Sequence, residues 1–177
     1  MAYFNIILRP DQQFSDICRE FAQKHFAAEA DGYCLSDQVH GHITLTQFQA
    51  ATAEDAARAA DFLKPEDVAY KPYFESMLFP FGQGRHQGKI WAWLNVQKDG
   101  ELLKFQARAF EALREAGLEP KTAMGAGYVP HVTLARLSDK AQITFGPVPE
   151  EMRGLNAYAW RLTVGYSDVN GQYLGDL

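Results

Sequence analysis

A four-residue motif occurs twice in the chain, as His-Ile-Thr-Leu at residues 42–45 and as His-Val-Thr-Leu at residues 131–134. The copies start 89 positions apart, at His42 and His131, which is about half of the 177 residues. The β-branched second residue predicts that each copy lies on a β-strand. Because side chains alternate along a strand, the His and Thr share one face and the aliphatic residues point into a core. The repeat therefore predicts two strands that each offer an imidazole and a hydroxyl to one cleft.

Coincidence explains the repeat poorly. The chain has five histidines, and the chance that two of them carry Thr at +2 and Leu at +3 is on the order of 10⁻⁴. One histidine on a strand is more often a hydrogen-bonded structural residue than a catalytic one. The functional interpretation therefore depends on the pair.

The hydrophobic pattern predicts strands and helices alternating along the chain. The expected helices begin after Pro10-Asp11, at a capping box in residues 52–55, and after Asp99-Gly100, the last of them ending at Gly117. Strands are expected at residues 3–8, 40–48, 68–79 and 89–96, from Pro130, near Tyr158 to Tyr166, and after an Asn170-Gly171 turn. A glycine-rich connection covers residues 80–88.

Two of the expected helices show apolar stripes that would face a core. The stripes are Phe14, Ile17, Cys18, Phe21 and Phe26 in the first helix, and Leu103, Ala107, Phe110 and Leu113 in the third. Each half of the chain thus delivers one motif after a helix and a loop, and no Pro-, Ser- or Gly-rich linker separates the halves. We expect an α+β fold, with residues 1–177 forming a single bilobal domain. Its two pseudo-symmetric lobes of antiparallel sheet, with flanking helices, would enclose a central cleft.

Composition narrows the classes of protein. The apolar fraction of 47% is enough for a substantial core, and the net charge of −5 disfavours binding to a long nucleic acid tract. No segment is apolar enough to cross a membrane, and the N-terminus lacks the features of a signal peptide, so we expect a cytoplasmic, soluble protein. Cys18 and Cys34 have neither the CxxC spacing of a redox or zinc site nor the density of a disulfide scaffold.

Paired imidazoles suit the hydrolysis of a phosphodiester. Imidazole exchanges protons near neutral pH, so one ring can take a proton from water while the other gives a proton to the leaving oxygen. In-line displacement at phosphorus requires these two groups to face each other across the phosphate. The threonine hydroxyls can donate hydrogen bonds to the non-bridging oxygens, where charge develops in the transition state. This chemistry requires no metal.

The paired motifs resemble those of the 2H phosphoesterase superfamily, which includes bacterial RNA 2′,3′-cyclic phosphodiesterases long called 2′-5′ RNA ligases. Residues 128–134, Tyr-Val-Pro-His-Val-Thr-Leu, are similar to the second motif of that family, and residues 41–45 are similar to the first. The strand expected at residues 89–94 and the closing hairpin extend the resemblance over most of the chain.

The resemblance implies a metal-independent site with His42 and His131 as catalytic residues and Thr44 and Thr133 as substrate-binding residues. Substrates would carry 2′,3′-cyclic or 2′-5′ phosphodiesters, as a small nucleotide or an RNA 3′ end, and no cofactor is implied. Tyr128 is the best aromatic candidate for a substrate contact, with a wall residue as the alternative. We expect a monomer. Which histidine is the base stays open, and so does the physiological substrate.

A non-catalytic module that binds a nucleotide or an RNA end in the same cleft is the alternative function. The presence of both imidazoles and both hydroxyls favours the enzyme. Arg85 and His86, in the glycine-rich connection, would reach a phosphate only if that loop covers the cleft, and solvated charges are the favoured interpretation. Arg136 is out of step with the motif face, which predicts an exposed or structural role. Trp91 and Trp93 share a strand face and are expected in the core.

His40 precedes His42 by two residues and is expected on the same strand face, together with Thr44 and Thr46. His-x-His is a common spacing for metal ligands. However, no Asp or Glu adjoins either motif at same-face spacing, which disfavours a metal site. We expect His40 at the cleft rim, where it tunes the pKa of His42 or touches substrate without being essential.

Overall fold

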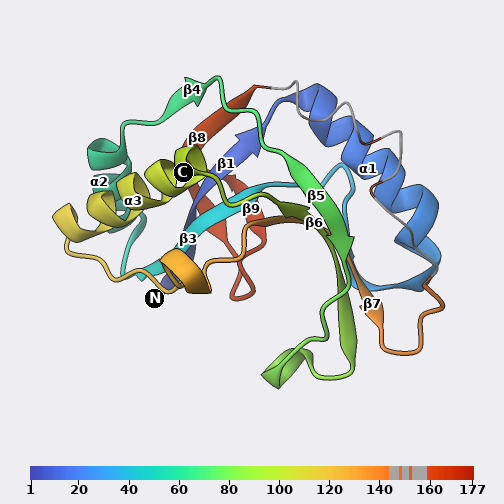
Figure 1. The fold of residues 1–177 in the computed structure, drawn as a ribbon. Helices are drawn as coiled ribbons and strands as arrows, with labels where there is room; N and C mark the ends of the chain where they lie inside the picture. The colour runs from blue at the N-terminus through green and yellow to red at the C-terminus, as the bar shows by residue number, and fades with distance from the viewer. Residues whose placement is uncertain (144–147, 149–151, 153–158) are drawn as a thin grey trace.

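A computed structural model of the chain describes residues 1–143, 148, 152 and 159–177. The strands among these residues join one sheet in which every pairing is antiparallel, in the order β4-β8-β1-β3-β7-β6-β5, with β2 added to β7 and β9 added to β8 (Figure 1). The strands are β1 (Ala2–Pro10), β2 (Ala30–Cys34), β3 (Ile43–Ala50), β4 (Glu66–Val68), β5 (Phe74–Leu78), β6 (Lys89–Val96), β7 (His131–Ser138), β8 (Trp160–Ser167) and β9 (Tyr173–Asp176). The α-helices are α1 (Gln12–Phe26), α2 (Ala53–Leu63) and α3 (Gly100–Glu115), and short 3₁₀ turns are η1 (Ala27–Glu29), η2 (Gly84–His86) and η3 (Gly125–Gly127).

The sheet divides into two lobes between β3 and β7. These two motif strands pair at Ile43 and Val132. On one side of this joint lie β1, β8, β4 and β9, and on the other side lie β6, β5 and β2. The expected α+β fold with two lobes of antiparallel sheet is therefore confirmed, and the motif strands are its central pair.

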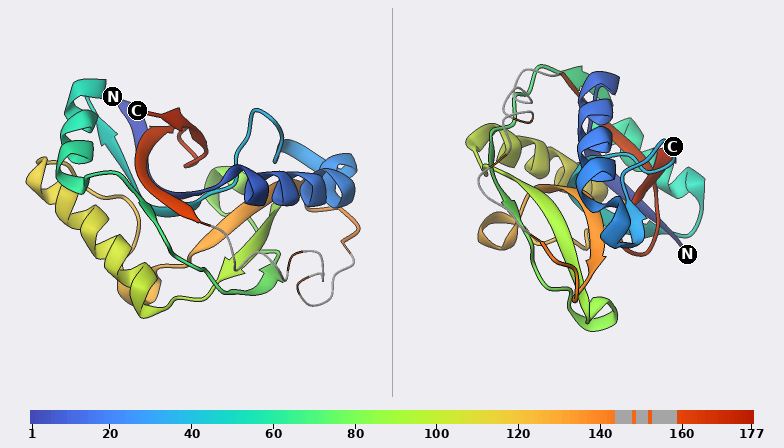
Figure 2. Two further views of the ribbon diagram at one scale, coloured as in Figure 1. Left: turned by 90° about the horizontal axis from the view of Figure 1, so that it is seen from above. Right: turned by 90° about the vertical axis from the view of Figure 1, so that its right-hand side faces the viewer.

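Two of the three described helices cover the motif strand of the other half of the chain. Helix α1 packs against β7 and β2, whereas α2 and α3 pack against β3 and, for α2, also β8. Figure 2 shows α1 on one side of the molecule and α2 with α3 on the other. The first half of the chain thus covers the second motif strand with α1, and α3 from the second half covers the first motif strand. Each lobe therefore contains elements from both halves, so the two motif strands share one interwoven scaffold.

The helices begin at the residues that the sequence indicates. The Asp11 carboxylate accepts a hydrogen bond of 2.9 Å from the backbone N–H of Phe14, and Asp99 caps α3 in the same way. Thr52 and Asp55 form the expected capping box of α2. Gly117 follows α3 with a φ of +71°, a left-handed conformation that suits glycine.

The buried face of α3 differs from the expected one. Leu102, Gln106, Ala109 and Leu113 are buried, while Leu103 and Ala107 are exposed. Both sets follow helical spacing, and they differ by one residue in phase. The polar Gln106 belongs to the buried face because its side-chain amide donates to the backbone carbonyls of Leu45 and Ala123. The buried hydrogen bonds of a glutamine are not visible in a hydrophobic pattern.

The region 68–79 is not one strand. It contains the end of β4, which pairs with β8 in one lobe, and β5, which pairs with β6 in the other. The chain therefore crosses between lobes here, and Pro72 in the crossing has no N–H to donate to a sheet. In the strand expected near Tyr158 to Tyr166, Tyr158 lies outside the described residues, and β8 begins at Trp160. In the described chain, no helix is long and apolar enough to cross a membrane.

Candidate active site

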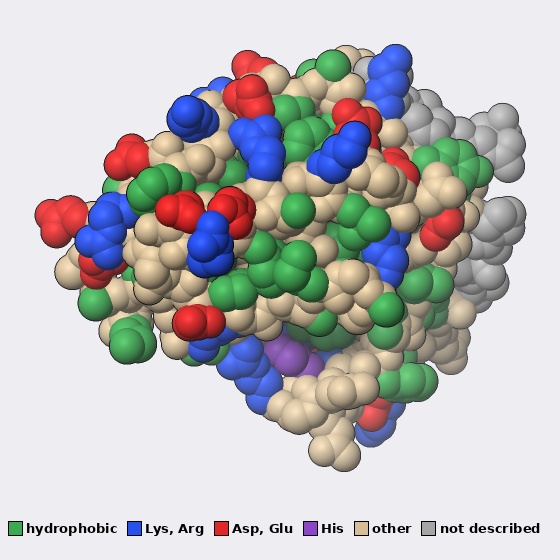
Figure 3. Space-filling model, turned by 60° about the vertical axis from the view of Figure 1, so that its left-hand side comes forward, with side chains coloured by type: hydrophobic (Ala, Val, Ile, Leu, Met, Phe, Trp, Pro, Cys, Tyr) green, Lys and Arg blue, Asp and Glu red, His purple; other side chains and the backbone are tan. Residues whose placement is uncertain are grey.

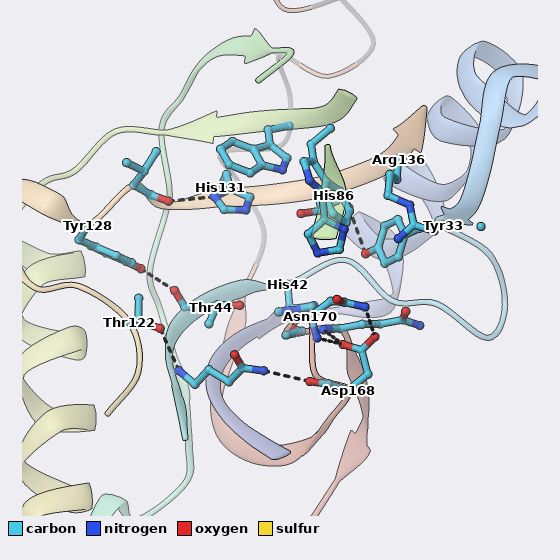
Figure 4. Close-up of a pocket in the computed structure, with 18 residues that line it drawn as sticks. Tyr33, His42, Thr44, His86, Thr122, Tyr128, His131, Arg136, Asp168 and Asn170 are labelled. Carbon is cyan, nitrogen blue, oxygen red and sulfur yellow. Dashed lines mark hydrogen bonds between the residues drawn. The ribbon is translucent and has the colours of Figure 1, made fainter. Parts of the chain in front are cut away.

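The joint between the lobes brings the two motifs together. In the antiparallel register set by Ile43 opposite Val132, His42 lies beside Thr133, and Thr44 beside His131. All four side chains line one cavity of about 430 Å³. In Figure 4, His131 lies above the cavity, with His42 and Thr44 below. The motif strands are thus related by a local pseudo-two-fold axis, and each histidine neighbours the threonine of the other motif.

Both motif strands carry a β-bulge at the leucine of the motif. In the pairing of β1 with β3 the extra residue is Leu45, and in the pairing of β6 with β7 it is Leu134. An extra residue shifts the alternation of all side chains that follow it. As a result, the fifth residue after each histidine also faces the cavity: Gln47 after His42, and Arg136 after His131.

The prediction that Arg136 lies off the motif face is therefore wrong. Its Nε donates to the backbone carbonyl of Asp31 at 2.7 Å, and its guanidinium lies 5.6 Å from the centre of the Trp91 ring. It forms no ion pair with a carboxylate in the described chain. The sequence signal of this bulge is the adjacent apolar pair Leu134 and Ala135. Strict alternation would expose one of them, but both are buried.

His42 is held between two backbone carbonyls. Its Nδ1 lies 3.1 Å from the carbonyl oxygen of His40, and its Nε2 lies 3.2 Å from that of Gly171. A neutral imidazole can donate to only one of these oxygens, whereas an imidazolium donates to both. The side chain is 8% exposed. Burial lowers the pKa of His42, and the two carbonyls oppose this shift.

His131 has one such contact and a free second nitrogen. Its Nδ1 lies 2.8 Å from the carbonyl oxygen of Val129, again two residues before the histidine. Its ring stacks on Trp93, with centroids 3.8 Å apart and planes inclined by 15°. No residue of the described chain makes a hydrogen bond with its Nε2. Burial lowers the pKa of His131 to about 4, and the charge of His42 acts in the same direction.

The turn between β8 and β9 carries the Gly171 carbonyl. The Asp168 carboxylate accepts hydrogen bonds of 2.8 Å from the backbone N–H groups of Asn170 and Gln172, which fix the turn. The Asn5 side chain also donates to the Gly171 carbonyl. Gln47 ties the turn to β3, since its amide donates to the backbone carbonyl of Asp168 at 2.9 Å. The motif position that holds Arg136 in β7 thus holds a structural amide in β3.

A tyrosine hydroxyl donates a hydrogen bond to the backbone of each motif. The Tyr128 hydroxyl donates to the carbonyl of Thr44 at 2.8 Å, and the Tyr33 hydroxyl donates to that of Thr133 at 3.5 Å. Tyr128 lines the cavity but is only 2% exposed, so it forms part of the wall. Lys98 secures the preceding loop, because its ammonium donates to the carbonyls of Gly125, Ala126 and Tyr128.

The aromatic residues of β6 also line the cavity. Trp91 and Trp93 are half-buried at its wall, which corrects the expectation that both lie in the core. His86 lies beside Trp91, with ring centroids 5.2 Å apart, and lines the same cavity. Arg85 instead reaches across to the β8–β9 turn, donating to the Val169 carbonyl at 2.6 Å. The glycine-rich loop thus borders the cleft, and the expectation of purely solvated charges is wrong for His86.

His40 does not share the motif face. It is exposed and lines a different pocket, next to Arg9 and Tyr173. The regular strand begins only at Ile43, so alternation does not extend back to residue 40. The backbone carbonyl of His40 faces the Nδ1 of His42, but the His40 imidazole lies in another pocket. The two histidines therefore do not form a His-x-His metal site. Among the residues that the structure describes, no group of three or more His, Cys, Asp or Glu side chains could hold a metal ion.

The cavity is an open cleft with distinct ends. Figure 3 shows a histidine surface in a hollow of the molecule, with lysine or arginine side chains beside it. In Figure 4, Tyr128 and Thr122 lie at one end of the cleft, and Tyr33, His86 and Arg136 lie at the other. The motif residues lie between these ends. A ligand with a phosphate at its centre can therefore extend in either direction.

The sequence matches the family model of the 2′-5′ RNA ligase superfamily over residues 21–165, most of the chain. The chain belongs to this superfamily. The resemblance to 2H phosphoesterases is thereby confirmed, and membership in the 2′-5′ RNA ligase superfamily supports phosphoesterase activity in general. No curated protein sequence matches the chain.

Solved structures share the fold at low sequence identity. A crystal structure described as a phosphoesterase is 18% identical, with 97% of this chain and 91% of that chain covered and a TM-score of 0.57. The apo form of E. coli LigT is 13% identical, with 94% and 88% covered and a TM-score of 0.57. The PDE domain of MHV ns2 is 13% identical, with 100% and 99% covered and a TM-score of 0.50. The superfamily fold therefore extends over nearly the whole chain.

Proposed function

We propose that the protein is a metal-independent phosphodiesterase that hydrolyses 2′,3′-cyclic or 2′-5′ phosphodiesters of nucleotides or RNA ends. One observation carries this proposal: two imidazoles and two threonine hydroxyls, from strands related by a pseudo-two-fold axis, line one cavity. Opposed imidazoles suit in-line displacement, in which the attacking and leaving oxygens lie on opposite sides of phosphorus.

The hydrogen bonds of the two histidines favour different roles. His131 directs the Nδ1 proton to Val129 and keeps the lone pair of Nε2 free, and its lowered pKa keeps it neutral, so His131 is the general base. His42 has an acceptor at each nitrogen, which opposes the lowering of its pKa by burial, and a bound anionic phosphate would act in the same direction, so His42 is the general acid.

In the reaction, His131 removes a proton from water as the water oxygen bonds to phosphorus. The bond from phosphorus to a ribose oxygen breaks, and His42 delivers the proton of Nε2 to that oxygen in exchange for its hydrogen bond to the Gly171 carbonyl. The product is a phosphomonoester with a free hydroxyl, and exchange with solvent restores both histidines. Thr44 and Thr133 donate to the non-bridging oxygens, and the Arg136 guanidinium balances their charge.

A nucleotide is the ligand class that the cavity and its relatives favour. A volume of about 430 Å³ lies within the range of small-molecule sites. Structures of E. coli LigT are described as complexes with 3′-AMP and with ATP, at TM-scores of 0.53 to this chain. We propose that Tyr128 forms the cavity wall beside such a ligand.

The test is hydrolysis of 2′,3′-cyclic nucleotides and 2′-5′ dinucleotides, with the products identified by phosphorus NMR. We expect turnover that EDTA leaves unchanged, and a loss of about 10³-fold in kcat for His42→Ala and for His131→Ala. Full inhibition by EDTA with recovery on adding Zn²⁺ would contradict the proposal. Tight AMP binding by calorimetry without turnover of any substrate would instead support the non-catalytic module.

A further inference from the structure

The stacking of Trp93 on His131 is the closest ring contact among the described residues. The centroids are 3.8 Å apart, and the planes are inclined by only 15°. Trp93 pairs with Thr133 across the β6–β7 ladder, while His131 pairs with Asn95, so the indole reaches diagonally to cover the imidazole. His42 has no equivalent, because its nearest aromatic ring, Tyr173, is 5.9 Å away and inclined by 55°.

We propose that Trp93 is the positioning residue of His131, whose indole fixes the plane of the imidazole so that Nε2 points into the cleft. This inference rests on the proposed function for its catalytic consequence. The hydrogen bond from Nδ1 to the Val129 carbonyl fixes one ring nitrogen, but small rotations about the two side-chain bonds can still tilt the ring without breaking it. A flat surface against one face of the ring removes that freedom. The two contacts together define both the direction and the plane of the imidazole.

The indole N–H of Trp93 makes no hydrogen bond with the described residues, so hydrogen bonding does not explain a tryptophan at this position. Its indole nitrogen is buried and has no partner among the described residues, which is a cost that a phenyl ring would avoid. The part of Trp93 that the site uses is therefore the ring face. Phenylalanine at this position would keep an aromatic face, and leucine would not.

The stack also affects proton transfer. The indole covers one face of His131 and excludes water from it, which disfavours the charged ring before reaction. The electron-rich indole face attracts an imidazolium and offsets part of this cost, but burial is the larger effect, because the pKa of His131 is lowered to about 4. Among the titratable groups of the described chain, His42 across the cleft is the one whose charge acts on His131. Trp93 therefore supports a neutral base that can still accept a proton.

Trp91 provides a matched control. It lies two residues earlier on the same face of β6 and lines the same cavity, but its ring contacts are with His86 at 5.2 Å, the Arg136 guanidinium at 5.6 Å and Tyr33 at 6.0 Å. Replacing Trp91 with leucine removes an indole from the same wall without touching the stack. Any change in His131 that follows from Trp93→Leu and not from Trp91→Leu is then specific to the stack.

The first measurement uses NMR and does not depend on activity. In the wild-type protein, we expect the indole ring current to shift the carbon-bound ring protons of His131 upfield, and burial to hold the pKa of His131 at about 4. We expect both properties to persist in Trp93→Phe and Trp91→Leu. In Trp93→Leu the upfield shift disappears, and the pKa of His131 rises towards the ordinary value of about 6.5. Unshifted His131 protons in the wild type would overturn the inference.

The second measurement is kinetic, with a 2′,3′-cyclic nucleotide as substrate. We expect Trp93→Leu to lower kcat about 10²-fold with KM changed less than about threefold, and Trp93→Phe to recover most of kcat. Equal losses in the leucine and phenylalanine variants, with the His131 titration unchanged, would overturn the positioning role. If the wild type hydrolyses none of the substrates, the proposed function fails, while the NMR comparison still decides on the stack. If Trp93→Leu does not fold, wild type and Trp93→Phe remain to test it.

Discussion

The two motif strands, β3 and β7, hold their histidines with the same backbone geometry in different surroundings. In both, Nδ1 of the histidine faces the carbonyl two residues earlier, and the leucine of the motif is a bulge residue. The fifth residue after each histidine then faces the cavity. The second nitrogen distinguishes them: Nε2 of His42 meets the Gly171 carbonyl, whereas no hydrogen bond from the described chain occupies that of His131. The two motifs thus share their backbone geometry, and the neighbouring elements give the two histidines different partners.

The surroundings of the two motifs differ in three respects. The β8–β9 turn reaches only the first motif, and the Trp93 indole covers only the second. The residues at the equivalent positions after each bulge also differ, an amide at Gln47 and a guanidinium at Arg136. The hydrogen bonds favour a proton donor at His42 and a neutral base at His131, and Arg136 adds a positive charge to the cavity that the first motif lacks.

A substrate whose leaving group needs no proton tests the different roles of His42 and His131 most directly. A nitrophenyl ester of a nucleoside phosphate releases a phenolate that is stable at neutral pH. We expect His131→Ala to lose about 10³-fold in kcat on the cyclic nucleotide and on the nitrophenyl ester alike, because both need an activated water. His42→Ala should lose as much on the cyclic nucleotide but less than about tenfold on the nitrophenyl ester, measured by steady-state kinetics.

The reverse result would exchange the two roles. If His131→Ala is the variant that the nitrophenyl ester rescues, His131 is the acid. Rescue of both variants, or of neither, would mean that the hydrogen bonds of the free protein do not predict the direction of proton transfer.

The pseudo-symmetry of the motifs could be predicted from the sequence, but its local breaks could not. The His and Thr positions follow from the repeat. The position of Arg136 does not, because one bulge residue reverses the alternation, and the sheet register that creates it depends on β6. Likewise, Gly171 is 129 residues from His42 along the chain, and no local pattern links them. A local hydrophobic pattern cannot predict contacts that depend on the pairing of strands far apart in the sequence.

Making the two bulge positions alike is the next test of the comparison. Arg136→Gln gives both motifs the same residue after the bulge and removes the guanidinium from the cavity. We expect kcat/KM for a cyclic nucleotide to fall about 30-fold, because a charge-assisted contact is lost. Gln47→Ala is the counterpart, and we expect a smaller loss, since Gln47 acts through the β8–β9 turn. An equal or larger loss in Gln47→Ala would contradict the proposed charge asymmetry.

A pH profile tests the different protonation of the histidines. Since the pKa of His131 is lowered to about 4, the base is lost only as pH falls through that value. We expect kcat/KM to fall about tenfold per unit below pH 4, and to fall again as pH rises through the pKa of His42, which burial holds below its ordinary value of 6.5. Trp91→Leu should leave the acid limb in place. An acid limb near pH 6.5 would mean that His131 is not shielded as the structure indicates.

The smallest effects should come from the two tyrosines whose hydroxyls donate to the motif backbone. Tyr128→Phe removes a hydroxyl that donates to the Thr44 carbonyl at 2.8 Å, and Tyr33→Phe removes one at 3.5 Å from the Thr133 carbonyl. Because the shorter bond is the stronger, we expect the free energy of unfolding to fall by about 1 kcal/mol in Tyr128→Phe and by less in Tyr33→Phe, measured by urea denaturation. The Tyr128 ring keeps its place in the wall, so KM should stay within about twofold. A large rise in KM for Tyr128→Phe would mean that the hydroxyl binds substrate, and that the first motif strand depends less on this support than the geometry indicates.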